Sequence, residues 1–299
     1  MKVFVTGATG VMGTSIARAL LSAGHDVKGL VRESSLARAR SMDFEPFVGD
    51  LFDPSSLARG MRGCDVVCNA ATHVPVRNGV LRPGAWRVND RIRSAGSRAV
   101  GAAAVETGVS RLVQGSVSFT YADQGGDVIT EQSAIEVSHA AEPVLMAESN
   151  AQQFAADGRE AVVLRFGTMV GNDDMTTWRI ERARAGKPIG VGDPYGWQHV
   201  IHVDDVGTAF LAALSSPSGF FNAGAEPVMR RDLVDGVARV AGRERGSFYR
   251  PLMLKFGGER IEWLARSQRV SSQKLTDRTG WKPLHPVFST EWLSGDIHV

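Results

Sequence analysis

Residues 3–13 are VFVTGATGVMG, an apolar strand followed by a turn with glycines at 7, 10 and 13 and by the start of a helix. Gly7 allows a sharp turn out of the strand, Gly10 allows backbone to approach a bound anion, and Gly13 allows the helix to pack closely on a sheet. The free N–H groups and positive dipole end of such a helix bind a diphosphate. A turn without a ligand can have the same spacing, but its position between strand and helix favours a dinucleotide site.

The composition is that of an ordinary globular protein. The chain has 299 residues, 43% hydrophobic and 22% charged, with a net charge of +2. This charge gives no reason to expect a nucleic acid or membrane partner, and no apolar run is long enough to span a bilayer. Cys64 and Cys68 have no metal-ligand spacing with other cysteines or histidines, so we expect no metal site. Without a signal peptide before the first strand, we expect a cytoplasmic protein.

Strand and helix patterns alternate along the first 170 residues. Beyond the opening strand, we predict strands over 27–31, 44–48, 64–70, 111–115 and 161–166, and helices over 12–23, 83–107 and 142–156. This alternation predicts an α/β fold with one doubly wound parallel sheet of the Rossmann type. In such a sheet ligands bind beyond the carboxyl ends of the strands.

The predicted second strand ends in Val31-Arg32, with no carboxylate before Glu33. An acidic residue at this point accepts hydrogen bonds from the ribose hydroxyls of NAD, whereas a basic residue suits the 2′-phosphate of NADP. We therefore predict NADPH in preference to NADH, with Arg32 as the contact. The alternative is that Arg32 is a solvated loop arginine.

The third strand is followed by Gly49-Asp50-Leu51. Asp50 either accepts from the adenine amino group or caps the next helix, although Asp53-Pro54-Ser55 already supplies a start signal for that helix. The fifth strand is followed by serines at 116 and 118, where chemistry is expected.

Eight motifs, in order along the chain, resemble those of the extended short-chain dehydrogenase/reductase family, which includes nucleotide-sugar epimerases and dihydroflavonol-type reductases. They are TGATGVMG at 6–13, Gly49-Asp50-Leu51, Asn69-Ala70-Ala71, Val88-Asn89, Val109 to Ser116, Leu164 to Gly171, His202 to Val206, and Gly280-Trp281-Lys282-Pro283. The resemblance implies an NADP-binding domain of residues 1–170, to which 200–224 return. It also implies a smaller substrate-binding domain of 171–199 and 225–299, with the active site between the two.

With the glycine turn and the strand ends, these motifs give the expected cofactor contacts. They are Gly7, Thr9, Gly10, Val11, Met12, Arg32, Asp50, Leu51, Ala70, Ala71, Asn89, Phe166, Thr168 and Met169.

The catalytic Tyr-x-x-x-Lys pair that the resemblance implies is missing. Val144 stands where the tyrosine belongs and Glu148 where the lysine belongs, and none of the tyrosines at 121, 195 and 249 has a lysine four residues on. The serine that accompanies the pair falls on Val117, between Ser116 and Ser118. In this the chain is similar to atypical reductases of actinomycete polyketide-antibiotic pathways, such as the ketoreductase acting on the angucyclinone of simocyclinone.

Several side chains are candidates for the missing acid. Ser116 and Ser118 either act on the substrate or hydrogen-bond the loop backbone, as serines in turns do. His139 is a candidate proton relay, and His202 is interpreted as a structural histidine beside Asp204. Glu148 either accepts from a ribose hydroxyl or lies on a solvated helix surface.

We expect an NADPH-dependent ketoreductase that acts on a bulky, aromatic small molecule such as an angucyclinone-like polyketide. Loss of the acid is compatible with ketone reduction, because positioning alone supplies roughly 7–11 kcal/mol of barrier lowering, whereas a general acid adds about 10²–10⁴-fold. The alternative is a non-catalytic NADP-binding sensor or regulator. The sequence makes no prediction of the oligomeric state.

Overall fold

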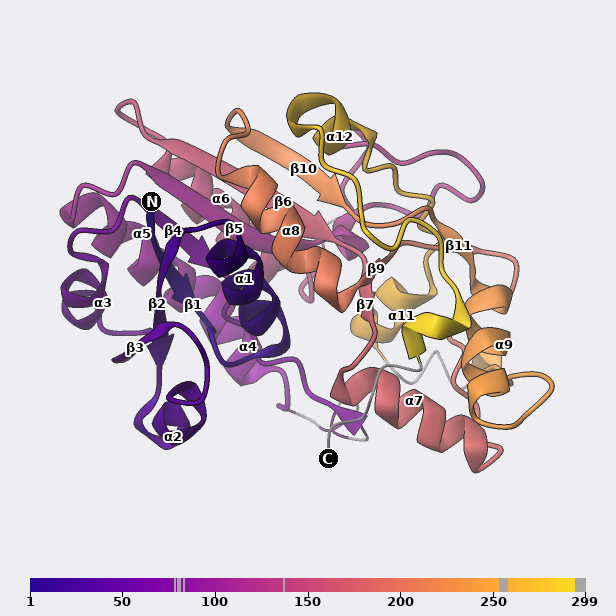
Figure 1. Cartoon of the computed structure of the whole chain (residues 1–299). Coiled ribbons are helices and arrows are strands. Elements are labelled where there is room, and N and C mark those ends of the chain that lie inside the picture. The colour runs from indigo at the N-terminus through magenta and orange to yellow at the C-terminus, as the bar shows by residue number, and fades with distance from the viewer. Residues whose placement is uncertain (78, 80–81, 83, 137, 253–257, 294–299) are drawn as a thin grey trace.

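The computed structural model describes residues 1–299 except 78, 80–81, 83, 137, 253–257 and 294–299. Its centre is a parallel sheet of seven strands in the order β10-β6-β5-β4-β1-β2-β3 (Figure 1). The strands are β1 Lys2–Thr6, β2 Asp26–Val31, β3 Glu45–Val48, β4 Val66–Asn69, β5 Arg111–Val117, β6 Glu160–Phe166 and β10 Gly219–Ala223. The predicted Rossmann-type α/β fold is confirmed.

Helices cover both faces of the sheet. Helices α1 (Val11–Ser22) and α8 (Val203–Ala213) pack on one face, and α3 (Pro54–Met61), α5 (Ser97–Glu106) and α6 (Glu142–Phe154) on the other (Figure 1). Successive side chains of β1 enter different cores, Val3 and Val5 with α1 and α8, and Phe4 with α3 and α5. Burial on both faces explains why β1, β4 and β6 are largely apolar runs in the sequence.

The predicted elements agree with the structure apart from small shifts of their ends and one division. The predicted helix over 83–107 consists of α4 (Arg87–Arg91), a π-helical turn (Ile92–Gly96) and α5. Its expected first residue, 83, lies outside the described residues. A π turn is wider than an α turn, and such turns are frequent at functional sites.

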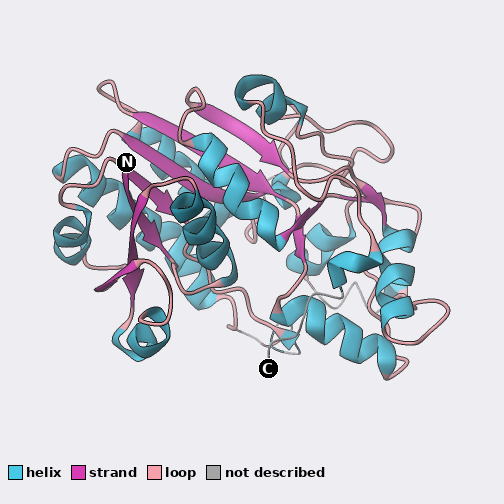
Figure 2. Ribbon diagram, viewed as in Figure 1, coloured by secondary structure: helices cyan, strands magenta, loops and turns pink. Residues whose placement is uncertain are grey.

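Beyond β6 the chain adds short strands and helices, and β7, α7, β9 and α9 contribute to a further apolar core (Figure 2). The elements are β7 Thr168–Val170, α7 Asp174–Arg184, β8 Trp197–Gln198, β9 Val200–His202, β11 Val228–Met229, α9 Arg230–Val240, α11 Glu259–Ala265 and α12 Gln273–Thr279, with small pairings β7–β9 and β8–β11. The expected return of 200–224 brings β10 against β6. The short helix α2 (Leu36–Ala39) follows β2. None of the described helices has the length and apolar character needed to cross a membrane.

Candidate active site

The glycine turn between β1 and α1 has the close packing expected of a phosphate site. Gly7 has φ +68°, and a Cβ on Gly13 would lie 2.1 Å from the carbonyl oxygen of Gly7. Gly10 is the N-cap of α1 with extended backbone, is exposed, and has no side chain that could cap the helix. No side chain caps the first N–H groups of α1 in this structure, which suits a dinucleotide diphosphate.

Hydrogen bonds hold the neighbouring strand ends in place. Thr6 Oγ1 donates to Asn69 Oδ1 at 2.5 Å and accepts from the Ala71 N–H at 3.3 Å. The Asn69 amide in turn donates to Gln114 Oε1 at 2.7 Å, which joins the ends of β1, β4 and β5. Asn89 accepts from the backbone N–H of His73 at 3.1 Å and so ties α4 to the loop after β4.

The other expected cofactor contacts lie along the same carboxyl edge of the sheet. Asp50 accepts from the Phe52 N–H at 2.9 Å, and Asp53 is the N-cap of α3, so the alternative that Asp50 caps this helix is wrong. The ring of Phe166 is buried and stacks on Phe210 at 5.7 Å between centroids, so the contact of Phe166 with the cofactor stays a prediction.

Leu51, Ala70, Thr168 and Met169 are buried or half-buried. Thr168 accepts from the Gln198 side chain at 3.0 Å. Their contacts with the cofactor, like those of Thr9, Val11 and Met12, stay predictions.

Arg32 is exposed at the end of β2, where it is the N-cap of the turn Glu33–Ser35. We expect the Arg32→Ala variant to bind NADPH about tenfold or more weakly, because charged hydrogen bonds contribute about 1.5–3 kcal/mol. Binding of NADH, which lacks the 2′-phosphate, should change little. Calorimetric titrations of the wild type and Arg32→Ala with NADPH and NADH measure these affinities. Equal affinities of the wild type for the two cofactors would remove the basis of the prediction.

Glu148, predicted to stand at the position of the family's lysine, is buried in an ion pair. Arg165 Nε and Nη2 donate to its two oxygens at 2.9 and 2.7 Å, and Ser116 Oγ donates to Oε1 at 2.6 Å. Glu148 is only 3% exposed, so the interpretation of a solvated helix surface is wrong. Although burial alone would lower the pKa of Arg165, the hydrogen bonds and charge of Glu148 raise it. The predicted catalytic hydroxyl of Ser116 is therefore engaged within the protein.

Tyr121 extends this buried network. Its hydroxyl accepts from Arg165 Nη1 at 3.0 Å and donates to Asn222 Oδ1 at 2.8 Å. The side chain is fully buried, and this burial raises its pKa although the nearby charge of Arg165 lowers it. Tyr121 is therefore a structural tyrosine that joins β10 to the end of β5.

Val144, predicted to stand at the position of the family's tyrosine, has apolar surroundings. Val144 is buried in a small cluster with Ala140, Ala141 and Trp263, against which Phe119 packs. An apolar wall excludes water but donates no proton.

Ser118, the second predicted catalytic serine, is fully buried beside His199, with 3.0 Å between Ser118 Oγ and His199 Nδ1. Burial lowers the pKa of His199 to about 3. Among the described residues, nothing hydrogen-bonds its Nε2. An enclosed Nε2 without a partner costs less as a bare lone pair than as an N–H group. We therefore place the proton of the neutral imidazole on Nδ1, which donates to Ser118 Oγ.

His199 makes stability depend on pH. Because its folded pKa of about 3 lies below the ordinary 6.5, the unfolded chain binds more protons between these values. Its contribution to stability is complete above pH 6.5 and declines as the pH falls, by about 1.4 kcal/mol per pH unit. We expect the free energy of unfolding between pH 6.5 and 4.5 to fall less steeply in His199→Gln. Urea titrations measure it, and parallel slopes would contradict the assignment.

His139, the candidate relay, is at the surface. Its side chain is 88% exposed and lies 3.2 Å from a carboxylate oxygen of Glu142. Among the aromatic side chains of residues 178–197, Arg182 lies over Trp178 at 5.0 Å, Arg269 lies over Trp197 at 4.9 Å, and Tyr195 is 74% exposed.

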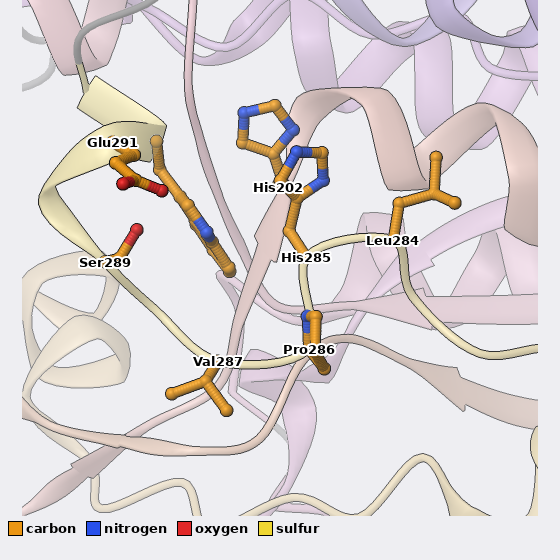
Figure 3. A pocket seen from close by; sticks show the side chains of 8 residues that line it. His202, Leu284, His285, Pro286, Val287, Ser289 and Glu291 are labelled. Atoms are coloured by element: carbon orange, nitrogen blue, oxygen red, sulfur yellow. The ribbon is translucent and has the colours of Figure 1, made fainter.

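A cavity of about 270 Å³ lies between the start of α8 and residues 284–292, and none of the predicted cofactor or catalytic residues lines it (Figure 3). His202 caps α8 by accepting from the Asp204 N–H at 3.3 Å, which confirms its predicted structural role. Asp205 accepts from the backbone N–H groups of Leu284 and His285 at 2.6 and 3.0 Å.

The side chains of His202, Asp205 and His285 also bring three possible metal ligands within 4.8 Å of one another. The imidazoles are stacked, with centroids 3.8 Å apart and an interplanar angle of 35°. Two stacked rings do not direct their nitrogen lone pairs at one ion, and the oxygens of Asp205 already accept three hydrogen bonds. These contacts hold residues 284–285 against the start of α8.

Comparison with known proteins agrees with this architecture. The model of the NAD dependent epimerase/dehydratase family matches residues 3–224. The chain belongs to this family. It is 30% identical to a 3-diazoavenalumate denitrifying reductase from a Streptomyces species, over 99% of both chains. It is 28% identical to 2-alkyl-3-oxoalkanoate reductase of Stenotrophomonas maltophilia, over 82% of this chain and 77% of the relative.

A human epimerase family protein, solved with NADPH, has the same fold, with a TM-score of 0.81 at 19% identity over 98% of both chains. The family and its reductase relatives support an oxidoreductase that uses a nicotinamide cofactor and acts on a small molecule.

Proposed function

We propose that this protein is a cytoplasmic NADPH-dependent reductase that transfers hydride to a bulky aromatic small molecule without a proton donor from the protein. The leading acceptor is a ketone on an angucyclinone-like aromatic polyketide. The observation that carries the proposal is the state of the groups at the end of β5. Ser116 donates to Glu148, Ser118 is enclosed with His199, and Val144 fills the position of the acid.

The remaining residues can bind and orient the reactants. The open start of α1 suits the diphosphate, and the dinucleotide supplies the hydride when it is bound. The apolar cluster around Val144 and Trp263 excludes water beside the end of β5. Positioning in a dry site supplies much of the rate enhancement of a hydride transfer.

The proton for the alkoxide then comes from the substrate or from solvent. A phenol adjacent to the ketone suits this role, because it is hydrogen-bonded to the oxygen that gains charge. In the test we measure NADPH oxidation with 1-hydroxyanthraquinone and with 1-methoxyanthraquinone, which lacks that proton. We expect the phenol to react about tenfold or more faster.

Equal rates with the phenol and its methyl ether would contradict proton supply by the substrate. Tight cofactor binding without NADPH oxidation by any acceptor would favour the non-catalytic sensor.

A second acceptor follows from the same missing acid. Hydride added to an aryl diazonium ion forms the arene and releases N₂, and this step requires no proton. The full-length Streptomyces relative is named as a denitrifying reductase of a diazo compound. Release of N₂ from an aryl diazonium salt, with one NADPH oxidised per N₂, would favour this acceptor over the ketone.

We expect Ser116→Ala, Ser118→Ala and His139→Ala each to lower kcat by less than the roughly 10²–10⁴-fold of a lost general acid. The structure gives the reason, since two of these side chains are held by protein partners and the third is at the surface. Steady-state kinetics with the best acceptor measure the effect. A loss of about 10³-fold in kcat at one position, with KM unchanged, would identify a catalytic acid.

A further inference from the structure

Arg93 is a buried arginine whose charge no described residue neutralises directly. It lies on the π-helical turn Ile92–Gly96 and is 7% exposed. Within the described part of the chain, its guanidinium makes no hydrogen bond or ion pair. Its nitrogens are not among the enclosed unpaired atoms, unlike the Nε of Arg230, so a ligand atom can reach them. Burial of a charge without a partner is costly, and an anionic ligand bound to Arg93 would offset this cost.

The two carboxylates near Arg93 are already paired with other arginines. The guanidinium of Arg93 interacts electrostatically with the charges of Glu148, Asp90 and Arg260. Glu148 is held by Arg165, and both oxygens of Asp90 lie 2.8 Å from Arg260 Nη2. Three guanidinium groups thus face two carboxylates, and the difference is one positive charge. Burial lowers the pKa of Arg93 to about 10, so the charge persists at neutral pH.

Arg93 lies on a turn that is fastened to α6, the helix beside the proposed reaction site. The Asn150 side chain of α6 donates to Ser94 O at 3.2 Å and to Ser97 Oγ at 2.7 Å, which fastens the π turn to the helix that carries Val144 and Glu148. One turn before Arg93, Asn89 holds the loop after β4. The π turn therefore holds Arg93 near Glu148, whose partner Ser116 lies at the end of β5, and a substrate is expected at this edge of the sheet.

The phosphates of the cofactor are expected elsewhere. The diphosphate fits the start of α1, and the 2′-phosphate fits Arg32 after β2, which is on the other side of β1 in the sheet order. An anion at Arg93 must therefore belong to the substrate. The planar guanidinium matches a carboxylate with two parallel hydrogen bonds.

We propose that Arg93 binds a carboxylate group of the substrate, an inference that rests on the proposed reductase function. The carboxylate anchors the molecule beside α6, and the surplus positive charge of the π turn selects acids over their neutral analogues. Arg93 is thus a binding and specificity-determining residue.

The test compares aromatic acids with their methyl esters as ligands of the NADP⁺-loaded protein. The probes are benzoate, cinnamate and 2-naphthoate, titrated calorimetrically. We expect at least one acid to bind the wild type about tenfold or more tightly than its ester. Arg93→Met should remove that difference, and Arg93→Lys, which keeps the charge but loses the fork, should retain part of it. Arg98→Met is the matched control, because Arg98 is exposed on the adjoining helix α5.

Two results would overturn the inference: no acid binds the wild type more tightly than its ester, or Arg93→Met weakens NADP⁺ and leaves the preference for acids. If Arg93→Met does not fold, a second measurement with the wild type alone decides. Millimolar acid should then raise the melting temperature while the ester does not. Failure of NADP⁺ itself to bind would contradict the proposed function, whereas normal NADP⁺ binding without a preference for acids contradicts only the role of Arg93.

Discussion

A Gly10→Leu variant is expected to fold normally and to lose binding of both NADPH and NADH. Gly10 has φ −83° and ψ 174°, an extended conformation that leucine adopts without strain. A Cβ at this position would have only the Gly7 carbonyl oxygen within 4 Å, at 3.3 Å. The remainder of the leucine would project over the first N–H groups of α1. Because a diphosphate at this point accepts several charge-assisted hydrogen bonds, we expect affinity to fall by about 100-fold or more.

Calorimetric titration with each cofactor measures the loss, and thermal unfolding checks the fold. The matched control is Gly126→Leu, because Gly126 is exposed and a Cβ there would have no atom within 4 Å. The control should bind both cofactors as the wild type does. Retention of NADPH affinity within tenfold in Gly10→Leu would show that the diphosphate does not lie at this turn.

The sheet and the position of the site could be predicted because local signals determine them. The close contacts of Gly10 and Gly13 lie within the segment itself, with Gly7 and Ala8, whereas a Cβ on Gly7 would meet Ala70 and Ala71 after β4. Strands β1, β4 and β6 are largely apolar because both of their faces are buried, as the opposite cores of Val5 and Phe4 show for β1. The carboxyl edge of a parallel sheet then follows from the alternation of strands and helices.

The partners of the charged residues could not be predicted, because they join distant segments. Glu148 and Arg165 belong to α6 and β6, and nothing in the sequence near either residue indicates burial. The surface interpretation of Glu148 rested on the rule that lone glutamates are solvated, which fails when a partner is buried too. Arg93 lies among Arg91 and Arg98, both exposed, and only the π turn distinguishes it.

The Glu148–Arg165 pair also shows why a lysine at position 148, where the family resemblance predicts one, would not be a local change. In the structure the carboxylate of Glu148 accepts from Arg165 and from Ser116, so the side chain belongs to the packing between α6, β5 and β6. A lysine at this position would place two cations together out of water. Absence of the Tyr-x-x-x-Lys pair therefore goes together with new contacts of Glu148 to Arg165 and Ser116.

We accordingly expect Glu148→Lys, which restores the family's lysine, to destabilise the protein rather than to create activity. Removal of one partner from a buried ion pair costs about 3–5 kcal/mol, because the other charge stays buried without compensation. Here Arg165, 5% exposed, would also face a like charge. Urea denaturation of the variant and the wild type measures the difference in the free energy of unfolding. The matched control is Glu142→Lys in the first turn of α6, whose side chain is 57% exposed and for which we expect about 1 kcal/mol or less. A loss below about 1 kcal/mol in Glu148→Lys, equal to the control, would show that the pair contributes little and that the lysine position tolerates either charge.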